Sequence, residues 1–444
     1  MDNDLFHYQH EGARWLLDPF APNKFRLLAD EMRLGKTAQV LEAINLDTSI
    51  SRVLVVCPAI ARPVWEAERE TFSRRTYHIS VVSYDSTFQK GSKKLQPKKE
   101  LLQPWDLLVL DECHYLANPD TARTRVSYLH LAPYAKRVWC LSGTPARNHN
   151  GDMYTFLRAA GVITMICSAF AARYCVIRHT VYGDQIVGSQ RTDELKTLLA
   201  PHCLRRRKAD VLPQLPPISF HHTPVEAGFV DVKRWYPEIY LGMTDLETVK
   251  NQVAQEIATI DAMARTMGGE TDDFAKALSA LQARTNASRR WTELQKCLPV
   301  AEMITDELDS GAYEKIVLFC WHANAVEEMW YQLKQFNPVR VWGATSDRNR
   351  RKAEREFQND PKCRVFIGNI QAAGVAINLN AAHEVAFLGS SYVPSDNAQA
   401  AMRCHDVRQL HPVRVRFFYI PGPTDETVQK ILKRKTRDLV QLFD

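Results

Sequence analysis

Hydrophobic and polar positions alternate along the chain in a pattern of short apolar strands separated by amphipathic helices. In the first half, apolar runs of strand length begin near residues 25, 52, 79, 107 and 137. Helix-like stretches, with apolar residues three or four positions apart, separate several of these runs. This alternation is typical of a parallel sheet covered by helices. A second set of strand candidates follows at 315–320, 339–342, 363–367, 384–388 and 413–420, and we therefore predict two α/β lobes in tandem.

Between the two lobes the strand pattern stops. The stretch from about residue 154 ends in LLAPHCLRRRKADVLPQLPP, where Pro213, Pro216 and Pro217 indicate a break in the chain. Residues 226–300 are polar and have helical periodicity. We therefore predict an N-terminal lobe over 1–224 with a helical extension over about 154–224. A C-terminal lobe over 225–444 would carry a helical insertion over about 226–300 and a closing basic helix over 425–443.

Composition narrows the class of protein. The 444 residues are 45% hydrophobic and 24% charged, as in soluble globular proteins. No apolar run approaches the ~20 residues of a membrane span, and the acidic, polar N-terminus does not resemble a secretory signal. Ten cysteines without a C-x-x-C pair indicate reduced thiols and a cytoplasmic location. A net charge of +6 is too small to establish a nucleic-acid partner by itself.

The first candidate site follows the strand at residues 25–29. A polar loop closes on Gly35, Lys36 and Thr37, and a helix pattern begins at once. This arrangement binds nucleotide phosphates: backbone N–H groups face the anion, Lys36 would contact the β- and γ-phosphates, and the Thr37 hydroxyl would bind Mg²⁺. The general pattern has a glycine where this chain has Asp30, so the match is partial.

A second motif, LLVLDECH, supports the same interpretation. Its apolar strand carries two acids to its carboxyl end: Asp111 would hold Mg²⁺, and Glu112 would orient and deprotonate the attacking water. The alternative is a strand that ends in a solvated acidic turn. Because both motifs occur in order, each at the end of a strand, we predict that the chain binds ATP and Mg²⁺.

Three further features surround these motifs. Gln9 lies in an amphipathic helix before the phosphate-binding loop, and its amide can donate and accept at the adenine edge. Ser142 and Thr144 form part of a polar turn after the strand at 137–141, where they could sense the state of the phosphates. The lysine-rich loop at 90–99 is either a DNA contact or solvated surface, and both interpretations stay open.

These motifs resemble those of the superfamily-two helicase core, and almost the whole chain is similar to the Swi/Snf family of helicase-like ATPases. ADEMRLGKT resembles the family's nucleotide loop, DECH its acidic box and LSGTPARN its third motif. LRRRKADVLPQLPP is similar to a block that this family carries between its lobes and that RNA helicases lack. AAGVAINLNAA and YVPSDNAQAAMRCHDVRQ resemble the fifth and sixth motifs. LPVAEMITDELDSGAYEKIVLFCWH is most like small bacterial, phage and annealing-helicase branches.

The resemblance implies two RecA-like lobes and an enzyme that hydrolyses ATP and moves along double-stranded or branched DNA. Implied catalytic residues are Lys36, Asp111, Glu112 and Arg403, with Thr37 and Asp111 as Mg²⁺ ligands. Implied ATP contacts are Gln9, Leu34, Gly35, Lys36, Thr37, Gln399, Arg403 and Arg408. Implied coupling residues are His114, Ser142 and Thr144. Implied DNA contacts are Arg62, Ser83, Tyr84, Arg206, His322, Arg350 and Arg351. We expect a monomer without a membrane partner, in the cytoplasm of a bacterial or phage-infected cell.

Two departures from the family pattern affect the expected rate. Arg33 replaces a second loop glycine, and it either crowds the phosphates or adds a positive contact. In the sixth motif, Asp406 stands where a second arginine is usual, and Arg408 stands where a glycine is usual. An arginine finger contributes ~10³–10⁵ in rate. We therefore predict slow turnover that depends on Arg403, with help from Arg408 only if the helix ends near 406, and a faster Asp406→Arg variant.

Three functions remain possible from the sequence. The first is a DNA-stimulated ATPase that translocates on duplex DNA. The second is an enzyme that migrates branches or anneals strands at forks. The third is a nucleotide-gated DNA-binding protein with weak turnover, as Asp406 could imply.

Overall fold

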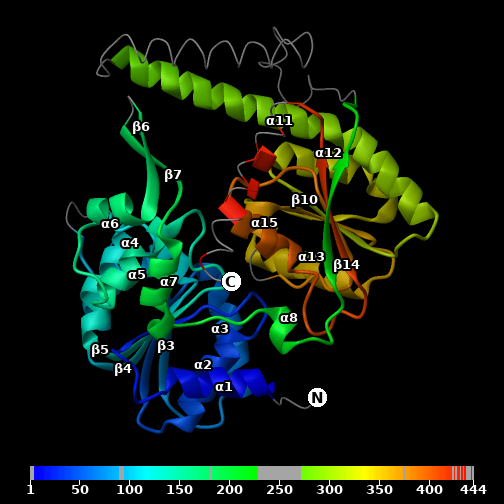
Figure 1. Cartoon of the computed structure of the whole chain (residues 1–444). Coiled ribbons are helices and arrows are strands. Elements are labelled where there is room, and N and C mark those ends of the chain that lie inside the picture. Colours follow the sequence, from blue (N-terminus) through cyan, green and yellow to red (C-terminus); the bar gives the residue numbers. More distant parts are fainter. Residues whose placement is uncertain are drawn as a thin grey trace. The chain divides into compact units, whose positions relative to one another are not determined.

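The computed structural model describes most of the chain and divides it into two compact units (Figure 1). The described residues are 5–89, 95–180, 183–228, 272–373 and 377–422, followed by 425, 428–430, 432, 433, 435, 436 and 442. The first unit comprises Met1–Ile177, Ile186–Gln214 and Lys435–Asp444, and the second comprises Arg178–Gln185 and Leu215–Arg434.

The first unit is built on a six-stranded parallel sheet with the order β3-β2-β4-β5-β1-β8. Its strands are β1 (Phe25–Leu28), β2 (Arg52–Cys57), β3 (His78–Ser83), β4 (Trp105–Asp111), β5 (Ala135–Leu141) and β8 (Cys203–Leu204). Strands of a covered parallel sheet are buried on both faces, which explains their nearly continuous apolar runs. The five strands predicted for this lobe are confirmed. The pattern missed β8, because two residues are too few to show an alternation.

Helices cover both faces of this sheet (Figure 1). The helices of this unit are α1 (His7–Leu16), α2 (Lys36–Leu46), α3 (Arg62–Phe72), α4 (Ala122–Arg125), α5 (Tyr154–Ala159), α6 (Cys167–Tyr174), α7 (Thr192–Leu199) and α8 (Lys208–Val211). Because successive side chains of a strand point to opposite faces, Leu28 packs with α1, α2 and α3, and Leu27 packs with α5, α6 and α7. Because β4, β5 and β1 are adjacent and parallel, their carboxyl ends lie at the same edge of the sheet.

The segment expected to be a helical extension, about 154–224, contains strands as well as helices. β6 (Cys175–Thr180) and β7 (Gly183–Ser189) form a two-stranded sheet. The boundary between the units also differs from the expected break after residue 224. It falls after Gln214, because β9 (Ile218–Pro224) pairs along its whole length with β14 of the second unit.

The second unit contains another six-stranded parallel sheet, with the order β11-β12-β10-β13-β14-β9. Its other strands are β10 (Ile316–Cys320), β11 (Val339–Val341), β12 (Val365–Asn369), β13 (Glu384–Phe387) and β14 (Val413–Tyr419). The helices are α11 (Asp272–Asp309), α12 (Ala323–Gln332), α13 (Asp347–Asn359), α14 (Ile370–Ala373) and α15 (Pro394–Ala401). α11 and α12 pack on one face of the sheet, and α13 and α15 pack on the other. The prediction of two α/β lobes in tandem is confirmed.

Two helical predictions fall partly outside the described residues. The end of the predicted insertion lies in α11, which continues to Asp309, whereas residues 229–271 are not described. Most of the predicted closing helix over 425–443 is not described either. Among the described helices, none combines the length and the apolar character that crossing a bilayer requires.

Candidate functional site

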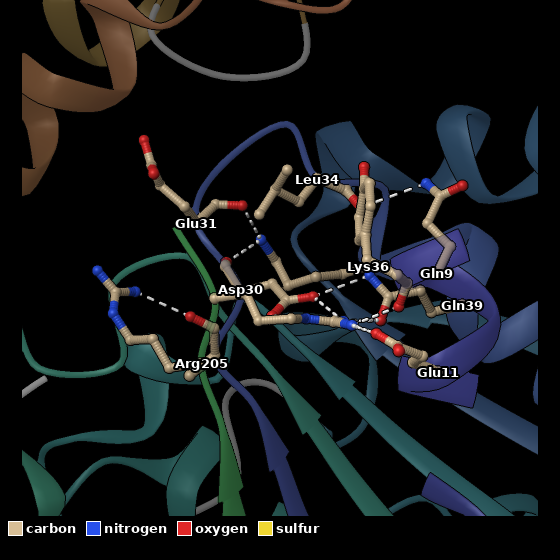
Figure 2. Close-up of polar contacts among 11 residues, drawn as sticks. Gln9, Glu11, Asp30, Glu31, Leu34, Lys36, Gln39 and Arg205 are labelled. Carbon is tan, nitrogen blue, oxygen red and sulfur yellow. Dashed lines mark hydrogen bonds and ion pairs between the residues drawn. The ribbon is translucent and has the colours of Figure 1, made fainter. Parts of the chain in front are cut away.

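The phosphate-binding loop connects β1 to α2, and its geometry depends on Gly35. Gly35 has a left-handed φ of 69° and directly precedes the first residue of α2, Lys36. A Cβ at this position would lie 2.2 Å from Nε2 of Gln9, so a side chain would displace the Gln9 amide, and the backbone conformation itself favours glycine. Gln9 donates from Nε2 to the carbonyl of Leu34 at 3.3 Å (Figure 2). α1 therefore holds its glutamine directly against the loop.

Arg33 adopts a backbone conformation that favours glycine. Its φ is 68°, a value that costs an ordinary residue roughly 1–2 kcal/mol. This explains why the family pattern has a glycine at this position. The positive charge of Arg33 also acts on Glu68 of α3: burial raises the pKa of Glu68 to about 7, Asp111 adds to this effect, and Arg33 opposes it.

Lys36 lies where the resemblance expects a phosphate contact. Its Nζ donates to the carbonyl oxygens of Asp30 at 2.9 Å and Glu31 at 3.4 Å (Figure 2). Burial lowers the pKa of Lys36, and the carboxylates of Glu112, Asp30 and Asp111 act in the opposite direction. The ammonium group thus lies within the field of the two predicted catalytic acids, and this is the arrangement that ATP-dependent chemistry requires.

Asp111 is the better supported of the two acids. Its Oδ2 accepts a hydrogen bond from Nε1 of Trp65 at 2.8 Å, and its Oδ1 accepts one from the backbone N–H of Glu112 at 2.9 Å. Burial and the charge of Glu112 raise the pKa of Asp111 to about 6, against the effect of the Trp65 hydrogen bond. Nothing in the sequence pattern distinguished Trp65, which looked like an ordinary apolar position of an amphipathic helix.

The residues available for Mg²⁺ fit its chemistry. A hydroxyl from Thr37 and a carboxylate from Asp111 are oxygen ligands, and proteins usually hold Mg²⁺ with one or two carboxylates together with substrate phosphates. The two hydrogen bonds on Asp111 fix the orientation of its carboxylate, as supporting residues of metal ligands commonly do. Among the described residues, no three His, Cys, Asp or Glu side chains cluster as a metal site.

Glu112 begins a connected path towards β5. It has a left-handed φ of 50° and starts the turn Cys113–Leu116. Nδ1 of His114 lies 3.1 Å from Oε2 of Glu112 and 2.9 Å from Oγ of Ser142. The same hydroxyl oxygen accepts the backbone N–H of Thr144 at 3.1 Å. The structure therefore brings together the three residues that the sequence assigned to coupling, and coupling itself stays a prediction.

Two of the residues expected to contact DNA, Arg206 and Tyr84, have partners inside the first unit, and DNA contact by them stays a prediction. The Arg206 guanidinium is 13% exposed and pairs with the carboxylate of Asp30 at 2.5 Å, so its charge is used inside the unit. Tyr84 is 3% exposed, and its hydroxyl donates to the backbone carbonyl of Asp111 at 2.8 Å. Arg206 therefore contacts a residue of the phosphate-binding loop, and Tyr84 contacts the backbone of the acidic motif. Ser83 is half-buried and Arg62 is exposed, and DNA contact by these two residues stays a prediction.

In the second unit, the expected DNA contact His322 is held by α11. Glu293, 2% exposed, accepts hydrogen bonds from the backbone N–H of Trp321 at 2.6 Å, from that of His322 at 3.1 Å, and from Nδ1 of His322. Because Nδ1 is engaged, Nε2 is the ring atom left to contact a ligand. Sequence reasoning missed Glu293, since its partner lies 29 residues later in the chain.

The basic helix α13 has an exposed side and a covered side. Arg351 is exposed, as are Arg348, Lys352 and Arg355. The Arg350 side chain is only 13% exposed, and its Nη1 lies 3.6 Å from Oδ1 of Asp347. The two arginines proposed as DNA contacts therefore have different environments, and Arg351 is the better candidate.

The sixth motif departs from the helical geometry assumed for it. α15 carries Gln399 but ends at Ala401, before Arg403, so Arg403 and Asp406 both lie beyond the end of the helix. Asp406 is 5% exposed and accepts hydrogen bonds from Nδ2 of Asn380 at 3.2 Å and from Arg408, through its backbone at 2.9 Å and its side chain at 2.6 Å. The carboxylate thus stabilises a turn and neutralises Arg408.

Two family models match the chain. The model described as SNF2-related domain matches residues 8–98 and 66–289, and the model described as helicase conserved C-terminal domain matches residues 299–408. Together these regions contain the phosphate-binding loop, the acidic pair and Arg403.

Curated relatives share the whole length of the chain at modest identity. SWI/SNF-related matrix-associated actin-dependent regulator of chromatin subfamily A-like protein 1 of Xenopus tropicalis is 29% identical over 458 residues, which cover 99% of this chain and 45% of the relative. DNA annealing helicase and endonuclease ZRANB3 of Homo sapiens is 24% identical over 459 residues, which cover 98% of this chain and 40% of the relative. The chain thus spans less than half the length of these two relatives.

Solved structures also match the chain. The Sulfolobus solfataricus SWI2/SNF2 ATPase core in complex with dsDNA has a TM-score of 0.43 and 20% identity, and the match covers 99% of this chain and 97% of that one.

Proposed function

Because this chain belongs to the SNF2-related family, we propose that it is a DNA-stimulated ATPase that moves along, or remodels, double-stranded DNA. The single observation that carries the proposal is the arrangement at one edge of the first sheet. Adjacent strands β4, β5 and β1 present the acids Asp111 and Glu112, the hydroxyl of Ser142 and the loop of Lys36. In parallel α/β sheets, ligands bind at the carboxyl ends of the strands.

The chemistry follows from the position of each group. The start of α2 and Lys36 would bind the phosphates, and Gln9 would read the adenine. Thr37 and Asp111 would hold Mg²⁺, which stabilises charge on the phosphates when bound. Glu112 would orient and deprotonate the attacking water. A change in Glu112 would reach Ser142 through His114, since Nδ1 of His114 is within 3.1 Å of both side chains.

DNA would be held mainly through its phosphates, by Arg62 and Ser83 in the first unit and by His322 and Arg351 in the second. Such contacts release counterions, so binding should weaken steeply with salt. A second candidate function, branch migration or annealing at forks, is favoured by the similarity to a relative named as a DNA annealing helicase.

The decisive experiment measures ATP turnover without nucleic acid and with duplex, single-stranded or forked DNA, with Glu112→Gln as the background control. We expect duplex DNA to raise turnover and Glu112→Gln to abolish it. Preference for forked over plain duplex DNA would favour the second function. Nucleotide-dependent DNA binding with negligible turnover would instead indicate a nucleotide-gated DNA-binding protein and overturn the proposal.

A further inference from the structure

Arg206 is at the centre of a buried polar cluster behind the phosphate-binding loop. Its Nε donates to Oδ1 of Asp30 at 3.0 Å, and its Nη2 donates to Oδ2 of Asp30 at 2.5 Å and to Oε1 of Gln39 at 2.8 Å. Asp30 is completely buried and also accepts a hydrogen bond from Nε2 of Gln39 at 2.9 Å (Figure 2). The bidentate pair therefore neutralises a carboxylate that has no access to water, and α2 completes the cluster through Gln39.

The remaining donor group of Arg206 reaches α1. Its Nη1 donates to the backbone carbonyl of Tyr8 and lies 3.9 Å from Oε2 of Glu11, and the guanidinium lies 5.3 Å from the centre of the Tyr8 ring. Gly12 permits this approach, because a Cβ there would lie 1.8 Å from Oε1 of Gln39 and 2.7 Å from Nη2 of Arg206. The residue next to Tyr8 is Gln9, whose amide contacts the loop at Leu34.

The backbone around Arg206 is also fastened to the loop. The N–H of Glu31 donates to the carbonyl of Arg206 at 3.0 Å, and the N–H of Ala29 donates to the carbonyl of Leu204 at 2.7 Å. In return, the N–H of Lys208 donates to Oε2 of Glu31 at 2.7 Å. The segment 204–208, which continues from β8, therefore runs beside loop residues 29–31.

We propose that Arg206 is a positioning residue for nucleotide binding, which fixes the base-reading helix α1 at a set distance from the phosphate-binding loop. This inference rests on the proposed function. It holds that the segment 204–208, which lies outside the nucleotide motifs, influences the affinity for nucleotide and the choice of base. Asp30 transmits the effect directly: its side chain binds Arg206, and its carbonyl oxygen accepts the hydrogen bond from Lys36. Movement of Asp30 would therefore displace the group that contacts the phosphates.

The cluster requires the shape of arginine as well as its charge. A guanidinium presents five N–H donors in a planar fork, whereas an ammonium group presents three donors at one point. A lysine at position 206 could neutralise Asp30 but could not also hold Gln39 and the Tyr8 carbonyl. The substitution Arg206→Lys thus keeps the net charge of the protein and removes the geometry.

The neighbouring residue provides a matched control. Arg207 is more than half exposed, and its Nε pairs with Oδ2 of Asp210 at 3.1 Å within the same turn. Arg207→Lys makes the same chemical change one residue away from the cluster. Gln39→Met is a milder second variant, which leaves the ion pair and removes the side-chain bonds of Gln39 to Asp30, to Arg206 and to the carbonyl of Leu34 in the loop.

The test measures equilibrium binding of fluorescent ATP and GTP analogues, with Mg²⁺ and without turnover, together with ATP turnover at saturating ATP and binding to duplex DNA. We expect Arg206→Lys to weaken binding of the ATP analogue about tenfold, which is the effect of losing one charged hydrogen bond. The ratio of the affinity for the ATP analogue to the affinity for the GTP analogue should move towards one. Turnover at saturating ATP should change less, about two- to threefold, and DNA affinity should stay the same. Gln39→Met should shift nucleotide binding in the same direction, and Arg207→Lys should not.

Two results would overturn the inference: nucleotide binding by Arg206→Lys that equals that of Arg207→Lys, or an unaltered protein that binds the two analogues equally. If Arg206→Lys does not fold, as judged by circular dichroism, Gln39→Met decides by the same criteria. Nucleotide binding is measured without hydrolysis. An unaltered protein that binds ATP without hydrolysing it would therefore contradict the proposed function. The role of Arg206 would still be decided by the binding measurements.

Discussion

Trp65 and Asp111 are joined by a hydrogen bond of 2.8 Å, from the indole Nε1 to the carboxylate Oδ2, across 46 residues of sequence. Trp65 is 1% exposed on α3, and Asp111 ends β4. The indole therefore sets the orientation of the carboxylate that we propose as a Mg²⁺ ligand. A helix on one face of the sheet thus supports chemistry at the strand ends.

Trp65→Phe removes this N–H and keeps most of the apolar volume. We expect about a tenfold increase in the Mg²⁺ concentration needed for half-maximal ATP turnover, because loss of a residue that orients a metal ligand typically costs about 10–100-fold. Trp105→Phe is the control, since Trp105 is equally buried and its Nε1 bonds to Leu101 rather than to an acid. Identical Mg²⁺ dependence in the two variants would contradict a role of Trp65 in the site.

Lys36→Ala and Glu112→Gln should abolish turnover for different reasons. Lys36→Ala removes the cation for the phosphates, and we expect weak ATP binding. Glu112→Gln removes the base and keeps the shape, so ATP should still bind while turnover falls about 10²–10⁴-fold. Binding and turnover measured in parallel separate the two cases. Normal turnover by either variant would end the assignment of the site.

Arg351→Ala and Arg350→Ala should differ in their effect on DNA binding. The exposed Arg351 is expected to contribute a phosphate contact, so its removal should reduce the slope of log affinity against log salt by about one unit. Arg350 is largely covered and lies near Asp347, and we expect its removal to lower the melting temperature and leave the slope unchanged. The adjacent variants control for each other. An unchanged slope for Arg351→Ala would show that this side of α13 is solvated surface.

The substitution Asp406→Arg should destabilise the folded protein. From sequence, the reversed charge predicts a variant with faster turnover; the structure instead gives Asp406 three hydrogen bonds, to Asn380 and Arg408. Removing a buried acceptor costs about 1–3 kcal/mol per group left unsatisfied. We expect a lower melting temperature and no gain in ATP turnover, with a smaller effect for Asp406→Asn. Faster turnover at an unchanged melting temperature would support the sequence-based prediction instead.

Glu68→Gln should stabilise the protein in a pH-dependent manner. Burial and Asp111 raise the pKa of Glu68 from its ordinary 4.5 to about 7, so the folded state holds a proton that the unfolded state releases between these pH values. The ionised carboxylate therefore reduces stability fully above pH 7, and this effect disappears as the pH falls below about 4.5. We expect a gain on the order of 1–2 kcal/mol at pH 8 for Glu68→Gln.

The measurement for Glu68 is the free energy of unfolding by urea at pH 8 and at pH 5. Glu66→Gln is the matched control, because Glu66 is exposed on the same helix. A gain that is equal at both pH values would show that the effect does not come from ionisation of the carboxyl group.

Features that depend on neighbouring residues could be predicted from the amino-acid sequence. The nucleotide motif is a continuous segment: a strand, the loop that ends in Gly35 and the helix that begins at Lys36. Its residue pattern therefore predicts its geometry. The acids Asp111 and Glu112 were predicted for the same reason, since the end of a buried strand is visible in the apolar pattern. Two parallel sheets followed from the repeated alternation of strands and helices.

The choice of which polar residues pair inside the protein depends on the three-dimensional fold. Arg206 and Arg207 are adjacent and chemically identical, yet one neutralises the buried Asp30 and the other pairs with Asp210 at the surface. Tyr84 and Trp65 likewise support Asp111 from distant segments. A buried polar group must find a partner because leaving it unpaired in a low-dielectric interior is costly. That partner comes from whichever segment the fold brings near, and local periodicity does not contain this information.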